Sequence, residues 1–226
     1  MCVIRSTPAP RPAVLRAWLA AYAAATSTTT AYSKVLDAAG LANKPAKETT
    51  VAYRDALSSL WLLDEVPPWI PGRNHLDRLC QASKHQLADP ALAVRLPGLD
   101  DAALLRAEQG SSTNLSEGTI LGALFEHLAA LSVQTYAEAG EARVSHLRTR
   151  GNDHEVDLIV QHADGRVLGV EVKLADRVED TDVRHLHRLR DRIGEDPIDA
   201  VVIYAGERAY RRRDDVAVVP LALLGP

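Results

Sequence analysis

The chain of 226 residues contains little cysteine, few aromatic side chains and no long hydrophobic run. Its two cysteines, Cys2 and Cys80, cannot form a disulfide framework, and they exclude a metal cluster held by thiolates. Aromatic residues make up 4% of the chain, which is too few for a surface that binds nucleic acid by base stacking. No apolar run approaches the roughly 20 residues that span a bilayer, and the first residues do not provide a signal-peptide core. We therefore expect a cytoplasmic protein with no membrane partner.

Lysine is scarce as well. Of 26 cationic side chains, five are lysines, at positions 34, 44, 47, 84 and 173, and the rest are arginines. This arginine-rich and alanine-rich composition indicates a GC-biased genome, in which lysine is the less expected residue at an arbitrary basic position. The net charge is −4, so any contact with nucleic acid must come from a local basic patch.

The N-terminal part is predicted to contain a flexible lead, residues 1–11, and a winged-helix-like domain, residues 12–75. Apolar residues recur at helical spacing in three stretches, residues 12–22, 31–39 and 47–60. A short extended segment at residues 61–63 and Pro67-Pro68 follow, and a plain three-helix bundle fits this pattern equally well. We expect Trp61 and Trp69 to pack the two domains together. Lys44 and Lys47 could contact DNA at the third helix, and a purely structural linker is the alternative.

Residues 76–226 are predicted to form an α/β domain with a mixed sheet. A short strand at 84–89, a helix from Pro90, a helix at 100–109 and a loop at 110–114 come first. A long helix is predicted at 119–134, because its apolar residues recur at i, i+3 and i+4. The period then changes to two, which predicts strands at 144–150, 155–161 and 167–174 around a turn at 151–153. A helix at 180–193, ended by Gly194, and strands at 200–204 and 216–221 complete the sheet.

Three strand residues carry the chemistry of this domain: Asp157, Glu171 and Lys173. Residues two apart on a strand share a face, so Glu171 and Lys173 point together while their apolar neighbours pack on the other side. A short turn between antiparallel strands can bring Asp157 beside Glu171. Two carboxylates are suitable ligands for Mg²⁺, and the Lys173 ammonium could hold an attacking water or offset charge on phosphorus.

This spacing resembles the signature of the PD-(D/E)xK nuclease superfamily, which has the restriction-endonuclease-like fold. Asp157 is followed after thirteen residues by Glu171 and then by Lys173. Glu126, on the preceding predicted helix, matches the acidic residue that many such folds add to the site. The resemblance implies that Asp157 and Glu171 are metal ligands, and that all four residues are catalytic with Glu126 assisting.

Residues 122–126, 148–150, 155–158, 169–173 and 202–208 are more closely similar to the domain of unknown function 4143. That domain forms the C-terminal part of prokaryotic AAA-type ATP-binding proteins, and the segment at 50–69 resembles the winged helix that precedes it there. The resemblance extends over about residues 12–222. No G-x-x-x-x-G-K-[ST] sequence occurs in the chain, so we expect no ATP site and infer that the ATPase module is absent.

Two functions follow as alternatives. One is a Mg²⁺-dependent, nuclease-like protein that acts on or binds DNA. The other is a catalytically silent module that binds DNA or protein, as a remnant or partner of an AAA-type ATPase or as a homo-oligomer. Glu155 could be a further ligand, although an edge charge is the favoured interpretation. Arg184, Arg188 and Arg192 share a helical face that could meet phosphates, with a salt-bridged surface as the simpler alternative.

Overall fold

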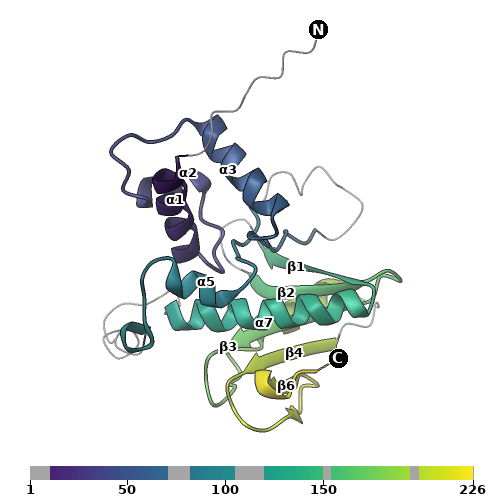
Figure 1. Cartoon of the computed structure of the whole chain (residues 1–226). Helices are drawn as coiled ribbons and strands as arrows, with labels where there is room; N and C mark the ends of the chain where they lie inside the picture. The colour runs from purple at the N-terminus through teal and green to yellow at the C-terminus, as the bar shows by residue number, and fades with distance from the viewer. Residues whose placement is uncertain (1–10, 71–81, 105–119, 150–153, 194–198, 226) are drawn as a thin grey trace.

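The computed structural model of the chain describes residues 11–70, 82–104, 120–149, 154–193 and 199–225. Figure 1 shows a group of helices from the N-terminal half above a sheet, with one long helix running across that sheet. Within the described ranges, no helix is long and apolar enough to cross a membrane.

The N-terminal helices pack around a core of aromatic rings. They are α1 (Pro12–Ala24), α2 (Tyr32–Ala38) and α3 (Lys47–Ser59). Pro12 occupies the first turn of α1, where its missing N–H leaves no hydrogen bond unmade. Trp18 and Tyr22 of α1 are fully buried, and the Trp18 ring lies 6.5 Å from the ring of Tyr53 on α3. These contacts hold the three predicted helices in one core.

The chain after α3 pairs with a distant segment through two antiparallel bridges. Leu63 pairs with Leu87, and Val66 pairs with Lys84. The sequence analysis predicted three helices followed by a short extended segment as the order of a winged-helix-like domain, and the assignment of that domain stays a prediction. The short strand predicted at 84–89 takes part through these two isolated bridges, not through a continuous ladder.

The two tryptophans predicted to join the domains behave differently. Trp69 is 5% exposed, and its indole N–H donates to Oε1 of Gln161 on the sheet, 3.2 Å away. Trp61 is 80% exposed, so the prediction is wrong for this residue. Its backbone has φ 57°, a left-handed conformation that ends α3 and leaves the side chain in solvent.

The next helix, α5 (Pro90–Arg95), is capped by the carboxylate of Asp89, which accepts a hydrogen bond from the N–H of Ala91 at 2.7 Å. Leu87 and Ala93 are buried in the same core as Trp18. The predicted boundary between residues 12–75 and 76–226 stays a prediction, and this core contains residues from both sides of it.

The C-terminal half is a mixed α/β layer, as predicted. Its elements are α7 (Ile120–Ala139), β1 (Ala142–Arg148), β2 (Glu155–His162), β3 (Val167–Lys173), α8 (Arg184–Ile193), β4 (Asp199–Tyr204), β5 (Tyr210–Arg211), β6 (Ala217–Pro220) and a 3₁₀ turn (Leu221–Leu223). The strand order is β1-β2-β3-β4-β6-β5. The pairs β3–β4 and β4–β6 are parallel and the others antiparallel. Because parallel neighbours need a crossover, α8 connects β3 to β4.

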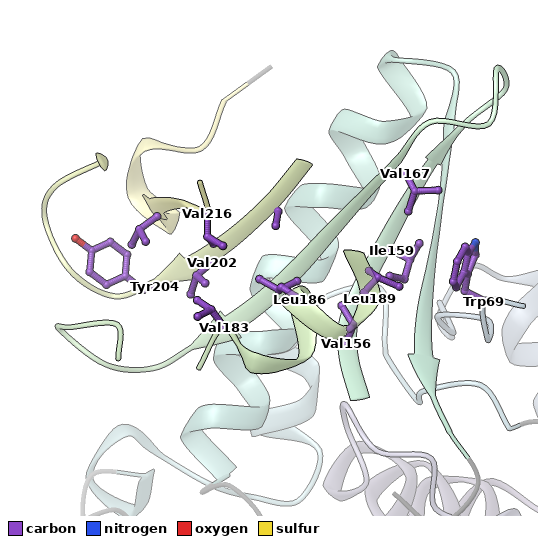
Figure 2. Close-up of a cluster of buried hydrophobic side chains, with 12 residues drawn as sticks. Trp69, Val156, Ile159, Val167, Val183, Leu186, Leu189, Val202, Tyr204 and Val216 are labelled. Atoms are coloured by element: carbon purple, nitrogen blue, oxygen red, sulfur yellow. The ribbon is translucent and has the colours of Figure 1, made fainter. Parts of the chain in front are cut away.

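The two faces of the sheet carry different helices. Ala129 and Val133 of α7 are buried with Val170 and Val172 of β3 on one face. On the other face, Leu186 and Leu189 of α8 lie among the sheet residues drawn in Figure 2. A Cβ atom added at Gly169 of β3 would lie 2.9 Å from Cδ2 of Leu189, so glycine permits this close approach of α8.

The remaining differences from the sequence predictions concern the ends of elements. The helix predicted at 180–193 begins at Arg184, because the Asp182 carboxylate accepts a hydrogen bond from the N–H of Glu179 and holds a turn before it. Of the helix predicted at 100–109, residues 101–104 are helical and the rest are not described. Residues 1–10 of the lead, the loop at 110–114, the turn at 151–153 and Gly194 lie outside the described residues.

Candidate functional site

Asp157 lies where β2 is irregular. The pairing of β1 with β2 shifts between Ser145 and Leu147, which places a bulge in β2 at Asp157 and Leu158. A bulge bends its strand and re-aims the side chain that it carries. Oδ2 of Asp157 accepts a hydrogen bond from the backbone N–H of Val172 on β3, 2.9 Å away. The carboxylate of Asp157 is therefore fixed against the neighbouring strand.

Glu171 and Lys173 share the other face of β3 from the valines that pack on α7, as predicted. Nζ of Lys173 lies 3.3 Å from Oε2 of Glu171. The side chain of Glu171 is 4% exposed, whereas that of Lys173 is 34% exposed. Oε1 of Glu171 is buried and accepts no hydrogen bond from the residues that the structure describes. The site therefore has one carboxylate oxygen with unused capacity and one ammonium group that reaches solvent.

The charges of these three residues act on one another. Burial and the negative charge of Asp157 raise the pKa of Glu171 well above its usual range. Burial alone would lower the pKa of Lys173, but the carboxylates of Glu171 and Asp157 outweigh it and raise that pKa. The structure therefore brings Asp157, Glu171 and Lys173 together in one electrostatic unit, and their roles in catalysis stay a prediction.

A fourth group, Lys84, was not among the predicted site residues. Its side chain is 1% exposed, and its Nζ lies 2.8 Å from Oε1 of Glu126 and 3.2 Å from Oδ1 of Asp157. Oε1 of Glu155 lies 3.3 Å from the same Nζ. Glu155, interpreted from the sequence as an edge charge, thus belongs to this cluster. We call Lys84, Glu126, Glu155 and Asp157 the lysine cluster.

The surroundings shift the pKa values of the two most buried carboxyls of the lysine cluster in opposite directions. Burial raises the pKa of Glu126, because the nearby Lys84 ammonium offsets only part of the cost of removing its charge from water. For Asp157 burial acts in the same direction, but Lys84, Lys173 and the N–H of Val172 together lower the pKa below its usual value. Asp157 is therefore the more firmly ionised of the two.

The ammonium of Lys84 stays charged in this setting. Burial by itself would lower its pKa, but Glu126, Asp157 and Glu155 outweigh burial and raise it. An ammonium group has three hydrogens to donate, and three carboxylates surround this one. Glu126, predicted to assist catalysis, is thus linked to Asp157 because both carboxylates contact Nζ of Lys84.

One signal in the sequence could have identified Lys84. Lysine is scarce in this arginine-rich chain, and two of the five lysines, Lys84 and Lys173, lie at this site. The pattern of residues 84–89 predicts only a short strand and gives no sign that Lys84 belongs to a charged site. Nothing in local periodicity links Lys84 to Asp157, which lies 73 residues further along the chain.

Asp157 and Glu171 have the donor chemistry for one Mg²⁺ ion. An ionised carboxylate offers about four lone-pair positions, and Asp157 uses two of them for Lys84 and Val172. Oε1 of Glu171 has no partner among the described residues. In that part of the chain, no group of three or more acidic, histidine or cysteine residues could hold a metal. Two carboxylates nevertheless fit Mg²⁺, which keeps several waters.

Basic side chains of α8 lie on the same side of the sheet as Lys173. Nη1 of Arg188 lies 2.9 Å from Nδ1 of His154, and Nε of Arg184 donates to Nε2 of His185 at 3.1 Å. The charges of Arg184, Arg188 and Lys173 all help burial to lower the pKa of His185. These four residues of α8 and its surroundings form a group that we call the α8 basic group: Arg184, Arg188, His154 and His185. The side chain of Arg192 lies outside the described residues.

In comparisons with known proteins, the models of two families match separate parts of the chain. Residues 121–224 match the model of a domain of unknown function (DUF4143), and residues 5–103 match that of a second domain of unknown function (DUF8612). The DUF4143 match is thus narrower than the resemblance seen in the sequence, which extended upstream to about residue 12. No curated protein matches the chain.

One solved structure is similar at low identity. It is a refined half-complex from the tetradecameric assembly of Thermococcus gammatolerans McrB AAA+ hexamers with bound McrC. The sequence identity is 11% and the TM-score 0.35, and the alignment covers 93% of this chain and 70% of that chain. A TM-score this low does not establish a shared fold. The DUF4143 model, which describes a domain of unknown function, matches residues 121–224, and these residues include the whole sheet and all of α7 except its first residue.

Proposed function

We propose that the α/β domain is a Mg²⁺-dependent, nuclease-like enzyme that hydrolyses phosphodiester bonds of DNA, with Asp157 and Glu171 as metal ligands. The observation that supports this most directly is the buried Oε1 of Glu171, which has no hydrogen-bond donor among the described residues. A buried acceptor without a partner is costly, and a bound cation would satisfy it. Asp157 lies beside it with acceptor capacity to spare.

The residues of the chain have separate roles in this proposal. A bound Mg²⁺ would supply Lewis-acid polarisation of the phosphoryl oxygen and acidify a coordinated water. Lys173 is close enough to Glu171 to be held by it and exposed enough to reach a substrate phosphate. Its ammonium would orient the attacking water or offset the charge that develops on phosphorus. Glu126 acts as a positioning residue, because it holds Lys84 against Asp157.

The α8 basic group supports a polyanionic substrate. Arg184 and Arg188 begin the helix that covers the Lys173 face of the sheet. Arginine contacts to phosphates position a nucleic acid without reading its sequence. Because the net charge of the chain is negative, such contacts must come from a local basic group, and the α8 basic group is one. DNA would therefore approach the carboxylates from the side of α8.

The test is Mg²⁺-dependent nicking of plasmid DNA and cleavage of single-stranded DNA by the full chain. Wild type is compared with Lys173→Met, Asp157→Asn and Glu171→Gln. Lys44→Met is the matched control, since Lys44 precedes α3 and forms an exposed ion pair with Asp37 of α2. Loss of one preorganised charged group commonly costs about 10²- to 10³-fold in rate. We expect that loss for Lys173→Met, near-complete loss for both carboxylate variants and no loss for the control.

DNA affinity separates chemistry from binding in the same set of proteins. Binding comes from several phosphate contacts, so Lys173→Met should weaken it only modestly. Cleavage that persists unchanged in Asp157→Asn and Lys173→Met would contradict the proposal and indicate a contaminant or another centre.

A catalytically silent module is the second candidate, and Lys84 favours it. Its ammonium already neutralises the carboxylates of Glu126 and Asp157, so the fold can hold these acidic residues without a metal. Such a module would bind DNA or an ATPase partner, as the resemblance to proteins with an AAA-type module implies. DNA binding by every variant, without cleavage by wild type at any Mg²⁺ concentration, would favour this candidate.

A further inference from the structure

The lysine cluster joins one cation to carboxylates from two separate elements. Glu126 comes from α7, while Glu155 and Asp157 come from β2. Lys84 comes from the segment that pairs with Val66, and its ammonium lies within 3.3 Å of an oxygen of all three carboxylates. The side chain of Lys84 is 1% exposed, so water does not compete with the three carboxylates for its ammonium group.

We propose that Lys84 is a built-in second cation of the site, which takes the place of a second divalent ion between Glu126 and Asp157. The proposal rests on the proposed function in one respect, namely that Asp157 and Glu171 hold one divalent ion. It goes further in specifying how many ions the site admits. Sites that hold two metal ions place them about 3.5–4 Å apart between shared carboxylates. Here the side chain of a lysine supplies one of those two positive charges.

The backbone fixes the position from which Lys84 reaches the carboxylates. The N–H of Lys84 donates to the carbonyl of Val66 at 2.9 Å, and the N–H of Val66 donates to the carbonyl of Lys84 at 3.1 Å. The next residue, His85, is held on both sides, because its N–H donates to Thr28 and its carbonyl accepts from Ser27. Lys84 is therefore anchored to the helical half of the chain while its side chain ends in the α/β half.

A second divalent ion and the Lys84 ammonium exclude each other. An ion bound to Glu126 and Oδ1 of Asp157 would lie beside a like charge in a poorly solvated space, where repulsion is weakly screened. Both would also need the same oxygens, since Oε1 of Glu126 and Oδ1 of Asp157 already accept from Nζ of Lys84. Removal of the ammonium should therefore open one cation position and leave the pair Asp157 and Glu171 unchanged.

The experiment counts bound Mn²⁺ ions in the full chain by electron paramagnetic resonance and calorimetric titration. The proteins are wild type, Lys84→Met, Lys84→Met with Glu126→Gln, and the control Lys44→Met. Methionine keeps much of the length of lysine and removes its charge. We expect one ion in wild type and in the control, two in Lys84→Met, and a return to one when Glu126 is also changed. The second ion of Lys84→Met should bind at least tenfold more tightly than any second ion of wild type.

The outcomes separate this proposal from the proposed function. No ion in wild type but one in Lys84→Met that requires Glu126 would support the role of Lys84 and contradict metal binding by Asp157 and Glu171. An equal number of ions in wild type and Lys84→Met, or two in wild type, would overturn the role of Lys84. If Lys84→Met does not fold alone, circular dichroism should show that Mn²⁺ restores the fold. A variant that stays unfolded in millimolar Mn²⁺ would also count against the proposal.

Discussion

Nζ of Lys84 lies 2.8 Å from Oε1 of Glu126, although the two residues are 42 positions apart in the chain. This ion pair is buried at the lysine and connects the segment after the N-terminal helices to α7, which lies in the region that the DUF4143 model matches. A charge held in this way is strongly coupled to its partners, because neither can be removed without leaving the other unpaired away from water. The ion pair therefore has consequences for stability as well as for metal binding.

Lys84→Met should destabilise the protein in the absence of divalent ions. The change leaves three carboxylates without their shared cation, and breaking a buried ion pair by removing one partner commonly costs about 3–5 kcal/mol. Urea unfolding in EDTA would measure the loss. Lys44→Met removes an exposed ion pair with Asp37 and should cost about 1 kcal/mol or less. Equal losses for both variants would show that burial of Lys84 contributes nothing to stability.

The two tryptophans near the junction form a natural matched pair. Trp69→Ala should cost about 3–5 kcal/mol of unfolding free energy, because Trp69 is buried against β2 and bonded to Gln161. Trp61→Ala should change it by about 0.5 kcal/mol or less, because Trp61 is exposed. Chemical denaturation followed by far-UV circular dichroism would test both. A large loss for Trp61→Ala would mean that its side chain has a partner.

His146 should make the fold sensitive to mild acid. Burial, assisted by the charge of Lys84, lowers the pKa of His146 to about 4 from the usual 6.5, although the hydrogen bond to the Ala82 carbonyl and the charge of Glu155 act in the opposite direction. In the unfolded chain this histidine therefore binds a proton below about pH 6.5, whereas in the folded protein it binds one only below about pH 4. Its contribution to stability is present above pH 6.5 and is lost as the pH falls, by roughly 3 kcal/mol in total.

The comparison with His146→Gln isolates this contribution. Glutamine can still donate a hydrogen bond to the carbonyl of Ala82, as Nε2 of His146 does at 3.1 Å, but it does not titrate. Urea unfolding at pH 7, 6 and 5 should show that wild type loses more stability than the variant over this range. Parallel losses in the two proteins would show that His146 is not the group responsible.

Mg-ATP should not bind to this chain. The sequence has no G-x-x-x-x-G-K-[ST] loop whose backbone amides could cradle the phosphates. Calorimetric titration with Mg-ATP should therefore give the same heat as titration with Mg²⁺ alone. Micromolar affinity for the nucleotide itself would overturn this expectation and indicate a phosphate site of another kind.

The sequence by itself determined the class of fold and the motif of the site. The change of hydrophobic period from 3.6 to 2 predicted the long helix followed by strands, and both depend on local hydrogen bonding and on which side of one element is buried. The alternation along β3 likewise predicted that Glu171 and Lys173 share a face. These features are local, so each can be inferred from residues that are close together in the chain.

Only the tertiary structure decided which charges meet. Asp157 is re-aimed by a bulge, and Lys84 reaches it from a segment that carries no local sign of this contact. The burial of Trp61 and Trp69 also differs, although both are large apolar residues near the same junction. Trp61 follows α3 in a left-handed conformation and is exposed, whereas Trp69 donates a hydrogen bond to the sheet and is buried. Burial and charge pairing depend on contacts across the whole fold, since the free energy of a charge is set by every group that surrounds it once water is removed.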